Sequence, residues 1–193
     1  MLRRLVDNWV YGGFLAGLLL LVLTPVLARD WSLALTLVFL ALPIYMLHQY
    51  EEHDADRFHR KINDLFGKGQ DVLPSGAIFV INIPVVWGVN AASFALATTD
   101  LGWALIALYT LTANAVVHIA QAAVARAYNP GLVTAIVLFL PLGIFGSLEV
   151  MRATPVSEMQ QVVALLVAIG THVAIQVYVF FNVRRLRKNP VPQ

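Results

Sequence analysis

Six long runs of apolar residues, separated by short polar segments, dominate the pattern of this chain. Each run is continuous rather than alternating, and each approaches or exceeds the roughly 20 residues that a membrane-crossing helix needs. Helices are the spanning element we expect, because an α-helix satisfies its backbone hydrogen bonds within its own segment. The predicted spans cover residues 9–28, 31–50, 74–99, 101–125, 130–148 and 159–183, with one sizeable loop over residues 51–72.

The composition agrees with an integral membrane protein. Hydrophobic residues fill 59% of the 193 positions and charged residues only 12%, about half the share in a typical soluble domain. Cysteine is absent, which excludes disulfides, a thiolate nucleophile and cysteine-ligated metals. The net charge is only +2 and no basic patch is interleaved with aromatic residues, so we expect no nucleic-acid partner. We therefore predict an all-α polytopic bundle of six transmembrane helices, forming a single integral membrane domain over residues 1–193.

Lysine and arginine residues predict how the helices are oriented. If the N-terminus is cytoplasmic, eleven of the 13 basic residues fall on the cytoplasmic side, and only Arg29 and Arg152 fall outside. This bias follows the positive-inside rule, so we expect both termini and the loop over residues 51–72 in the cytoplasm. A cleaved signal peptide is the alternative for the first span. Its apolar run is longer than the usual ~7–15 residues of such signals, which favours a retained helix.

Ionisable residues gather at the end of the second apolar run, in the stretch "LHQYEEHDADRFH". At 100° per residue, His48, Glu51 and Glu52 fall on one face of a helix. Asp56 and His59 extend this stripe if the helix continues, but their basic neighbours favour emergence into the cytoplasm. Imidazole and carboxylate groups at this spacing can share a metal ion or exchange a proton. The ordinary alternative is an amphipathic helix whose charges face water.

Later spans also carry polar residues. Asn114 and His118 share one face of the fourth span, and His172 lies in the sixth. His48 and His118 are at similar depth and His172 is somewhat deeper. The three residues lie on the second, fourth and sixth spans, which all run toward the cytoplasm in this topology, so their side chains can converge. An ionisable residue inside a membrane span is a functional candidate. A packing histidine bonded to a neighbouring helix is the ordinary alternative.

The stretch "RAYNPG" predicts the start of the fifth helix. Asn129 is a suitable N-cap, and Pro130 is a suitable first helical residue. Free backbone N–H groups at such a start can bind an anionic headgroup or phosphate. An ordinary turn before a helix explains the same residues.

Three motifs in this order resemble those of a known family. They are "HQYEE" from His48 to Glu52, a later intramembrane histidine best matched by His118, and "YNPG" from Tyr128 to Gly131. The set is similar to the HXXEE-motif family of small bacterial integral membrane proteins, and the resemblance covers about residues 42–146. The family has no established function, so the resemblance implies a site but no reaction. The residues that it implies are His48, Glu51, Glu52, His118, Tyr128, Pro130 and Gly131.

We expect a membrane-embedded enzyme that acts on a lipid-like or isoprenoid substrate near the cytoplasmic face. Its reactive groups would be His48, Glu51, Glu52 and His118. One mechanism is metal-dependent, with His48, Glu52 and His118 binding zinc, iron or manganese; the other is metal-free acid–base catalysis. The other predicted site residues are Asn114, Tyr128, Pro130, Gly131 and His172. A small proton-coupled transporter and a non-catalytic interaction subunit are the alternatives, and the pattern predicts no oligomeric state.

Overall fold

The structure is a computed structural model that describes residues 2–188, and over that range it contains helices and no strands. Its helical stretches include six that are long and apolar enough to cross a membrane: Arg3–Leu27, Leu33–Gly67, Ser75–Ala97, Leu101–Ala125, Leu132–Ala153 and Glu158–Leu186. The predicted all-α bundle of six spans is therefore confirmed. The predicted location of the C-terminus concerns residues 189–193, which lie outside the described residues.

Short segments of altered helical pitch interrupt several of these spans. In chain order the elements are α1 (Leu2–Leu27), α2 (Leu33–His53), η1 (Asp54–Asp56), α3 (Arg57–Ile62), η2 (Asn63–Gly67), α4 (Ser75–Val80), η3 (Ile81–Trp87), α5 (Gly88–Ala97), η4 (Leu101–Ala104), α6 (Leu105–Ala125), α7 (Leu132–Thr134), η5 (Ala135–Phe139), α8 (Leu140–Ala153) and α9 (Glu158–Lys188). Wider turns inside α-helices, such as η3 and η5, frequently occur beside functional sites.

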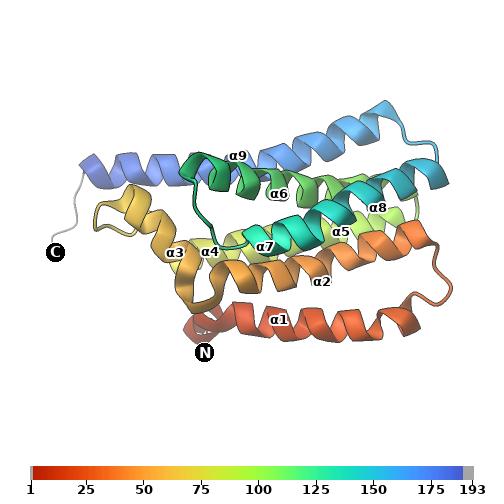
Figure 1. The fold of residues 1–193 in the computed structure, drawn as a ribbon, viewed down its shortest axis with the longest axis horizontal. Helices are drawn as coiled ribbons and strands as arrows, with labels where there is room; N and C mark the ends of the chain where they lie inside the picture. The colour runs from red at the N-terminus through yellow and green to blue at the C-terminus, as the bar shows by residue number, and fades with distance from the viewer. Residues whose placement is uncertain (1, 189–193) are drawn as a thin grey trace.

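The long helices run side by side along the longest axis of the molecule (Figure 1). α1 packs against α2, and α6 packs against both α8 and α9. The interior of the bundle is centred on α6, where Leu105, Leu108 and Leu111 have no exposed surface. The N-terminus, α3 and the end of α9 all lie at one end of the bundle, on the left in Figure 1.

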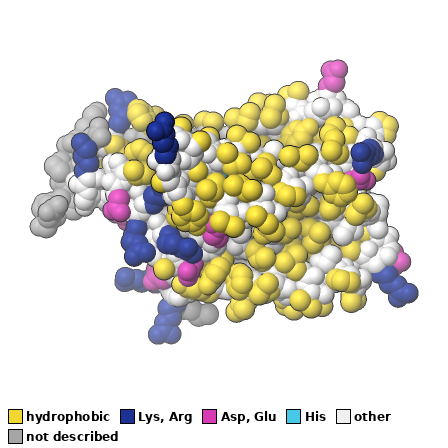
Figure 2. All heavy atoms as spheres, viewed as in Figure 1, with side chains coloured by type: hydrophobic (Ala, Val, Ile, Leu, Met, Phe, Trp, Pro, Cys, Tyr) yellow, Lys and Arg dark blue, Asp and Glu magenta, His cyan; other side chains and the backbone are white. Residues whose placement is uncertain are grey.

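The surface is divided into an apolar middle and charged ends. On the face shown in Figure 2, hydrophobic side chains cover the middle, whereas Lys and Arg gather at the end that carries the N-terminus. Leu19, Val22 and Leu166 are 58%, 75% and 64% exposed. Soluble monomers rarely expose contiguous apolar surface on this scale, whereas the hydrocarbon of a bilayer would cover it. The fold therefore indicates a membrane protein.

The segment predicted as a loop over residues 51–72 is mostly helical. α2 extends into it, and α3 and η2 follow after a break at Ala55 and Asp56, whose φ angles are 51° and 60°. Non-glycine residues in this left-handed region end a helix and turn the chain. The break moves Asp56 and His59 off the face that carries His48, so the predicted stripe does not continue beyond α2.

The fifth span begins at Leu132, so the predicted start at Asn129 and Pro130 is wrong. Gly131 precedes the first helical residue with a φ of 93°, a left-handed conformation that glycine adopts without steric cost. The side chain of Asn129 does not cap this helix and instead bonds His118. The Asn-Pro-Gly segment therefore supports a buried side chain rather than forming a simple helix cap.

Candidate functional site

Three ionisable side chains from two helices meet inside the bundle. His48 and Glu52 are one turn apart on α2 and face His118 on α6. The Nε2 atoms of His48 and His118 each lie 3.7 Å from a carboxylate oxygen of Glu52. The three residues are 0%, 8% and 5% exposed in the order His48, Glu52, His118. One potential ligand atom from each lies within 4.8 Å of the others, so the structure brings together the three residues predicted as metal ligands.

The hydrogen bonds of His48 determine which ring nitrogen carries its proton. Nδ1 lies 2.8 Å from the hydroxyl oxygen of Thr134, and that hydroxyl donates its single proton to Glu51 at 2.5 Å. The Thr134 oxygen is then available to accept, so a neutral His48 ring carries its proton on Nδ1. Nε2 is left with a lone pair, and it has no hydrogen-bond partner among the described residues.

Asn129 orients His118 in the same way. Its amide nitrogen donates to the backbone carbonyl of His118 at 2.8 Å, which leaves Oδ1 at 2.6 Å from Nδ1 of the ring. Because an amide oxygen only accepts, Nδ1 of a neutral His118 ring carries the proton. Nε2 therefore directs a second lone pair toward Glu52. Imidazoles held through Nδ1–H, with Nε2 free to coordinate, are typical of metal-binding histidines.

Gly131 has no side chain, and this leaves room for the rings of His48 and His118. A Cβ atom built at this position would lie 2.7 Å from Cε1 of His118 and 2.8 Å from Cε1 of His48. Such distances are shorter than van der Waals contact, so any larger residue would push the rings away from Glu52. The glycine of the "YNPG" motif is therefore required by close packing against the cluster as well as by its backbone conformation.

Glu51 points away from the cluster although it precedes Glu52 in sequence. Successive helical residues differ by 100° in direction, so the two carboxylates face different elements. Glu51 accepts from the backbone N–H groups of Val133 and Thr134, at 3.1 and 2.7 Å, and from the Tyr128 hydroxyl at 2.8 Å. A carboxylate at the N-terminus of a helix is also electrostatically favourable. Glu51 thus joins α2 to α7, and the structure does not bring it into the cluster with Glu52.

Tyr128 and Pro130 have separate positions around the cluster. Burial raises the pKa of the Tyr128 hydroxyl, and so does its hydrogen bond to the carboxylate of Glu51. Tyr128 therefore stays protonated at neutral pH and remains a hydrogen-bond donor to Glu51. Pro130 lines an apolar cavity beside His118. Some motif residues therefore form the cluster, namely His48, Glu52 and His118. The others, such as Glu51, Tyr128 and Gly131, make contacts around it.

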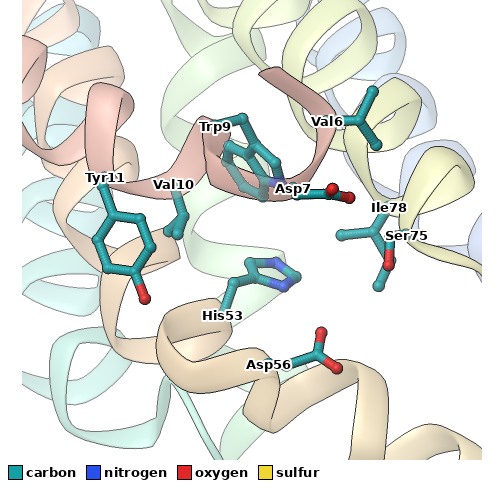
Figure 3. Close-up of a pocket in the computed structure, with 9 residues that line it drawn as sticks. All are labelled: Val6, Asp7, Trp9, Val10, Tyr11, His53, Asp56, Ser75 and Ile78. Carbon is teal, nitrogen blue, oxygen red and sulfur yellow. The ribbon is translucent and has the colours of Figure 1, made fainter. Parts of the chain in front are cut away.

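The structure adds His53 to the surroundings of Glu52. Its Nε2 lies 3.3 Å from Glu52 Oε2, and its ring packs edge-on against Trp9 at a centroid distance of 5.2 Å. Figure 3 shows the ring directed into a pocket of about 260 Å³ that Asp7 and Asp56 also line. His53 therefore separates Glu52 from this polar pocket. Sequence reasoning did not select it, because at about 140° from His48 on a helix it lies at the edge of the predicted stripe.

Two further predicted residues border the cluster without joining it. Asn114 donates to the Tyr45 hydroxyl at 3.0 Å, and Nδ1 of His172 donates to the Ala168 carbonyl at 2.7 Å. Both side chains line a narrow cavity of about 50 Å³ that also reaches Glu52. Asn114 and His172 thus shape the interior next to the carboxylate, but neither is among the clustered ligand atoms.

Asp56 and His59 form a separate group nearer the surface. The two ring nitrogens of His59 lie 2.8 Å from Asp56 and 3.0 Å from Asp71. These bonds tie α3 to the residues that precede α4. Asp56 and His59 therefore hold the segment that follows the break in α2, rather than extending the cluster.

The fold and the site define an all-helical bundle of membrane type with a buried histidine–glutamate cluster. The chain belongs to the HXXEE-motif family: a family model described as "Protein of unknown function with HXXEE motif" matches residues 39–146. That range contains the three clustered residues and the "YNPG" motif, so the predicted family is confirmed. Neither the curated proteins nor the solved structures gave a match to this chain.

Proposed function

We propose that this protein is a membrane-embedded, metal-dependent enzyme that acts on a lipid-like substrate near the cytoplasmic face. The proposal rests on the hydrogen-bonded orientation of His48 and His118, whose Nε2 lone pairs both point toward the Glu52 carboxylate. Lone pairs and a carboxylate repel one another when they are buried together, unless a cation lies between them. A bound metal ion would turn this repulsion into three favourable bonds.

The set of ligand atoms suits a divalent metal. Two imidazoles and one carboxylate are a common combination for catalytic zinc, and they also bind iron and manganese. With bonds of about 2.0–2.2 Å, ligand atoms in a tetrahedral site lie roughly 3.3–3.6 Å apart. The 3.7 Å separations join His48 to Oε2 and His118 to Oε1 of Glu52, and one ligand atom from each residue lies within 4.8 Å of the others, so the side chains would close in slightly around a metal ion. Three protein ligands would leave a position for water or substrate, and the metal would polarise a carbonyl or phosphoryl oxygen there.

The cavities around the cluster favour a substrate with a hydrophobic part. An apolar cavity of about 420 Å³ reaches the ring of His118. On the other side, His53 separates Glu52 from the polar pocket of Figure 3. A substrate that combines a hydrocarbon part with a polar reacting group would match a site between these two environments.

The orientation of the bundle is part of the proposal. The end that carries the cluster also carries Arg57, Arg60 and Lys61, and basic residues favour the cytoplasmic side of a membrane. We therefore assign this end, with the N-terminus, to the cytoplasm. The substrate would then reach the cluster from the inner leaflet.

One observation favours a metal-free alternative. Nε2 of His53 lies 3.3 Å from Glu52, a separation across which a protonated imidazole can pair with a carboxylate. In that case Glu52 and His53 would act as acid and base toward a lipid substrate without a metal ion. The two functions make opposite predictions about the metal content of the protein.

The metal content of the purified protein tests the proposal. After incubation with zinc, iron or manganese and removal of loosely bound ions, we expect about one metal ion per chain, as measured by elemental mass spectrometry. The double substitution His48→Ala, His118→Ala should abolish this binding, because it leaves a single carboxylate in the cluster.

Two matched variants test whether the loss of any histidine lowers the metal content. His59→Ala and His172→Ala remove histidines outside the cluster, so their metal content should equal that of the unmodified protein. Size-exclusion elution in detergent should be unchanged for every variant. Metal-free protein that still converts a lipid, or equal metal content in the double variant and the unmodified protein, would show that the proposed metal site is wrong.

A further inference from the structure

The apolar cavity beside His118 is a surface groove that reaches the cluster. It lies between the α3–η2 segment on one side and α6 and α9 on the other, with a volume of about 420 Å³. This volume is within the range of pockets that hold small-molecule ligands. The side chains that line it are mostly apolar and include Phe58, Ile62, Leu65, Phe66, Val124 and Pro130.

The rim of the groove is suited to contact with hydrocarbon. Leu65, Phe66 and Val124 line it and are 61%, 47% and 87% exposed. Exposed apolar side chains around an apolar depression mark a surface that is covered by lipid or ligand rather than by water. The rim therefore offers a hydrophobic contact surface to an apolar chain.

Lys61 gives the groove its charge preference. It is the only charged side chain among the lining residues, and it forms no ion pair among the described residues. Lysines at membrane surfaces place their aliphatic stem along apolar groups and direct the ammonium toward a headgroup. The amides of Gln121 on α6 and Gln176 on α9 supply hydrogen-bonding groups in the opposite wall. Charge complementarity therefore favours an anionic headgroup.

His118 connects the groove to the proposed reaction centre. Its ring belongs to the groove wall, while its Nε2 lies 3.7 Å from Glu52. We propose that the groove binds a membrane amphiphile with one apolar chain and an anionic headgroup, held by Lys61 and placed against His118. This inference names the substrate class of the proposed function and rests on that function for its catalytic meaning, although binding in the groove can be measured without it.

A second groove provides an internal comparison. It has a similar volume of about 480 Å³, lies between the α4–η3 segment and α9, and is lined by residues such as Val80, Ala174 and Tyr178. The described residues that line it include no charged side chain and none of the three clustered residues. Hydrocarbon could occupy both grooves, but only the groove at Lys61 should prefer an anion.

Photolabelling of the full-length protein tests this inference. The probes are a long-chain fatty acid that carries a diazirine near its carboxylate, and the methyl ester of the same compound. After irradiation in detergent, peptide mass spectrometry locates the labelled residues. We expect the acid to label peptides from residues 58–66 and 118–130 about tenfold more than the ester does, because one charge-assisted contact is worth about that factor.

Three variants assign the effect to the groove. Lys61→Gln should abolish the preference for the acid, and Lys61→Arg should retain it. Ala125→Trp, which fills the groove, should reduce labelling of residues 118–130 about tenfold or more. Its matched control, Ala174→Trp in the second groove, should leave that labelling unchanged.

The outcomes separate this inference from the proposed function. Equal labelling by acid and ester, or labels spread over the lipid-facing surface in every variant, would contradict the groove even if the protein binds metal. Acid-specific labelling that depends on Lys61 would support the groove even in protein that binds no metal. Metal content measured on the same samples distinguishes these cases.

Discussion

The direction of each imidazole in the cluster depends on a single uncharged side chain. Thr134 accepts from His48, and Asn129 accepts from His118; both come from the chain around Gly131. Such outer partners fix the tautomer and the ring orientation of metal-binding histidines. The segment between α6 and η5 therefore determines which atoms face Glu52, although it contributes no ligand atom to the cluster itself.

Replacement of Thr134 by valine tests this role. Valine has nearly the same shape but offers no hydroxyl, so His48 loses the group that keeps its proton on Nδ1. We expect Thr134→Val to weaken metal binding by about 10–100-fold, the usual cost of losing an outer partner. Competition with a chelator of known affinity measures the change.

Serine at the same position is the matched control. It restores the hydroxyl, so Thr134→Ser should bind metal nearly as tightly as the unmodified protein. The role assigned to Thr134 would be wrong if the valine variant bound metal normally, or if the serine variant were as weak as the valine variant.

The chemistry of individual residues could be predicted from sequence only in part. Helical spacing and equal depth were enough to select His48, His118 and the adjacent pair Glu51 and Glu52. They could not separate Glu51 from Glu52, because that depends on how α2 is rotated against its neighbours. Thr134 carried no signal at all, since its position beside His48 follows from the turn at residue 131.

At the scale of elements, the break after α2 positions the groove and the cluster relative to each other. Ala55 and Asp56 have left-handed φ angles of 51° and 60°, and the chain then continues into α3 and η2. This segment forms one wall of the groove that contains Lys61. Hydropathy predicted the end of the apolar run but not this turn, because two consecutive left-handed residues without glycine have no reliable sequence signal.

The orientation of the spans is a prediction at the same scale. The chain has no cysteine, so a single introduced cysteine is its only thiol. In intact cells, a membrane-impermeant maleimide should label cysteine at positions 30, 99 and 157. Cysteine at positions 68 and 127 should react only after the membrane is permeabilised, because we expect these connections in the cytoplasm.

The reverse labelling pattern would contradict this orientation. It would place the cluster near the outer face of the membrane and change the leaflet from which a lipid could enter. Labelling of all five positions in intact cells would instead show that the spans do not separate the connections into two sides.

At the scale of the whole molecule, the number and extent of the spans follow from length and hydropathy alone. Six continuous apolar runs of sufficient length leave few alternatives to a helical bundle, and the structure contains the corresponding six stretches. Even-numbered helices were predicted to carry the histidines to similar depth, and His48 and His118 do meet. The grooves beside α9 could not be predicted, because they depend on which neighbouring helices α9 contacts and on which it leaves uncovered.

The buried cluster has a consequence for the stability of the whole bundle. A buried carboxylate facing two lone pairs raises the free energy of the folded state unless a cation compensates it. A ligand that binds only the folded state stabilises it in proportion to the logarithm of its concentration above the dissociation constant. The proposed metal ion would therefore contribute to the fold as well as to chemistry.

X-ray absorption spectroscopy of the metal-loaded protein in detergent tests the central proposal most directly, because it reports the atoms around the metal. We expect a first shell of nitrogen and oxygen at about 2.0–2.2 Å together with the outer scattering of two imidazoles. That imidazole scattering should decrease by half in His48→Ala or His118→Ala. A first shell without imidazole, or a spectrum that neither substitution changes, would contradict a metal centre formed by His48, Glu52 and His118.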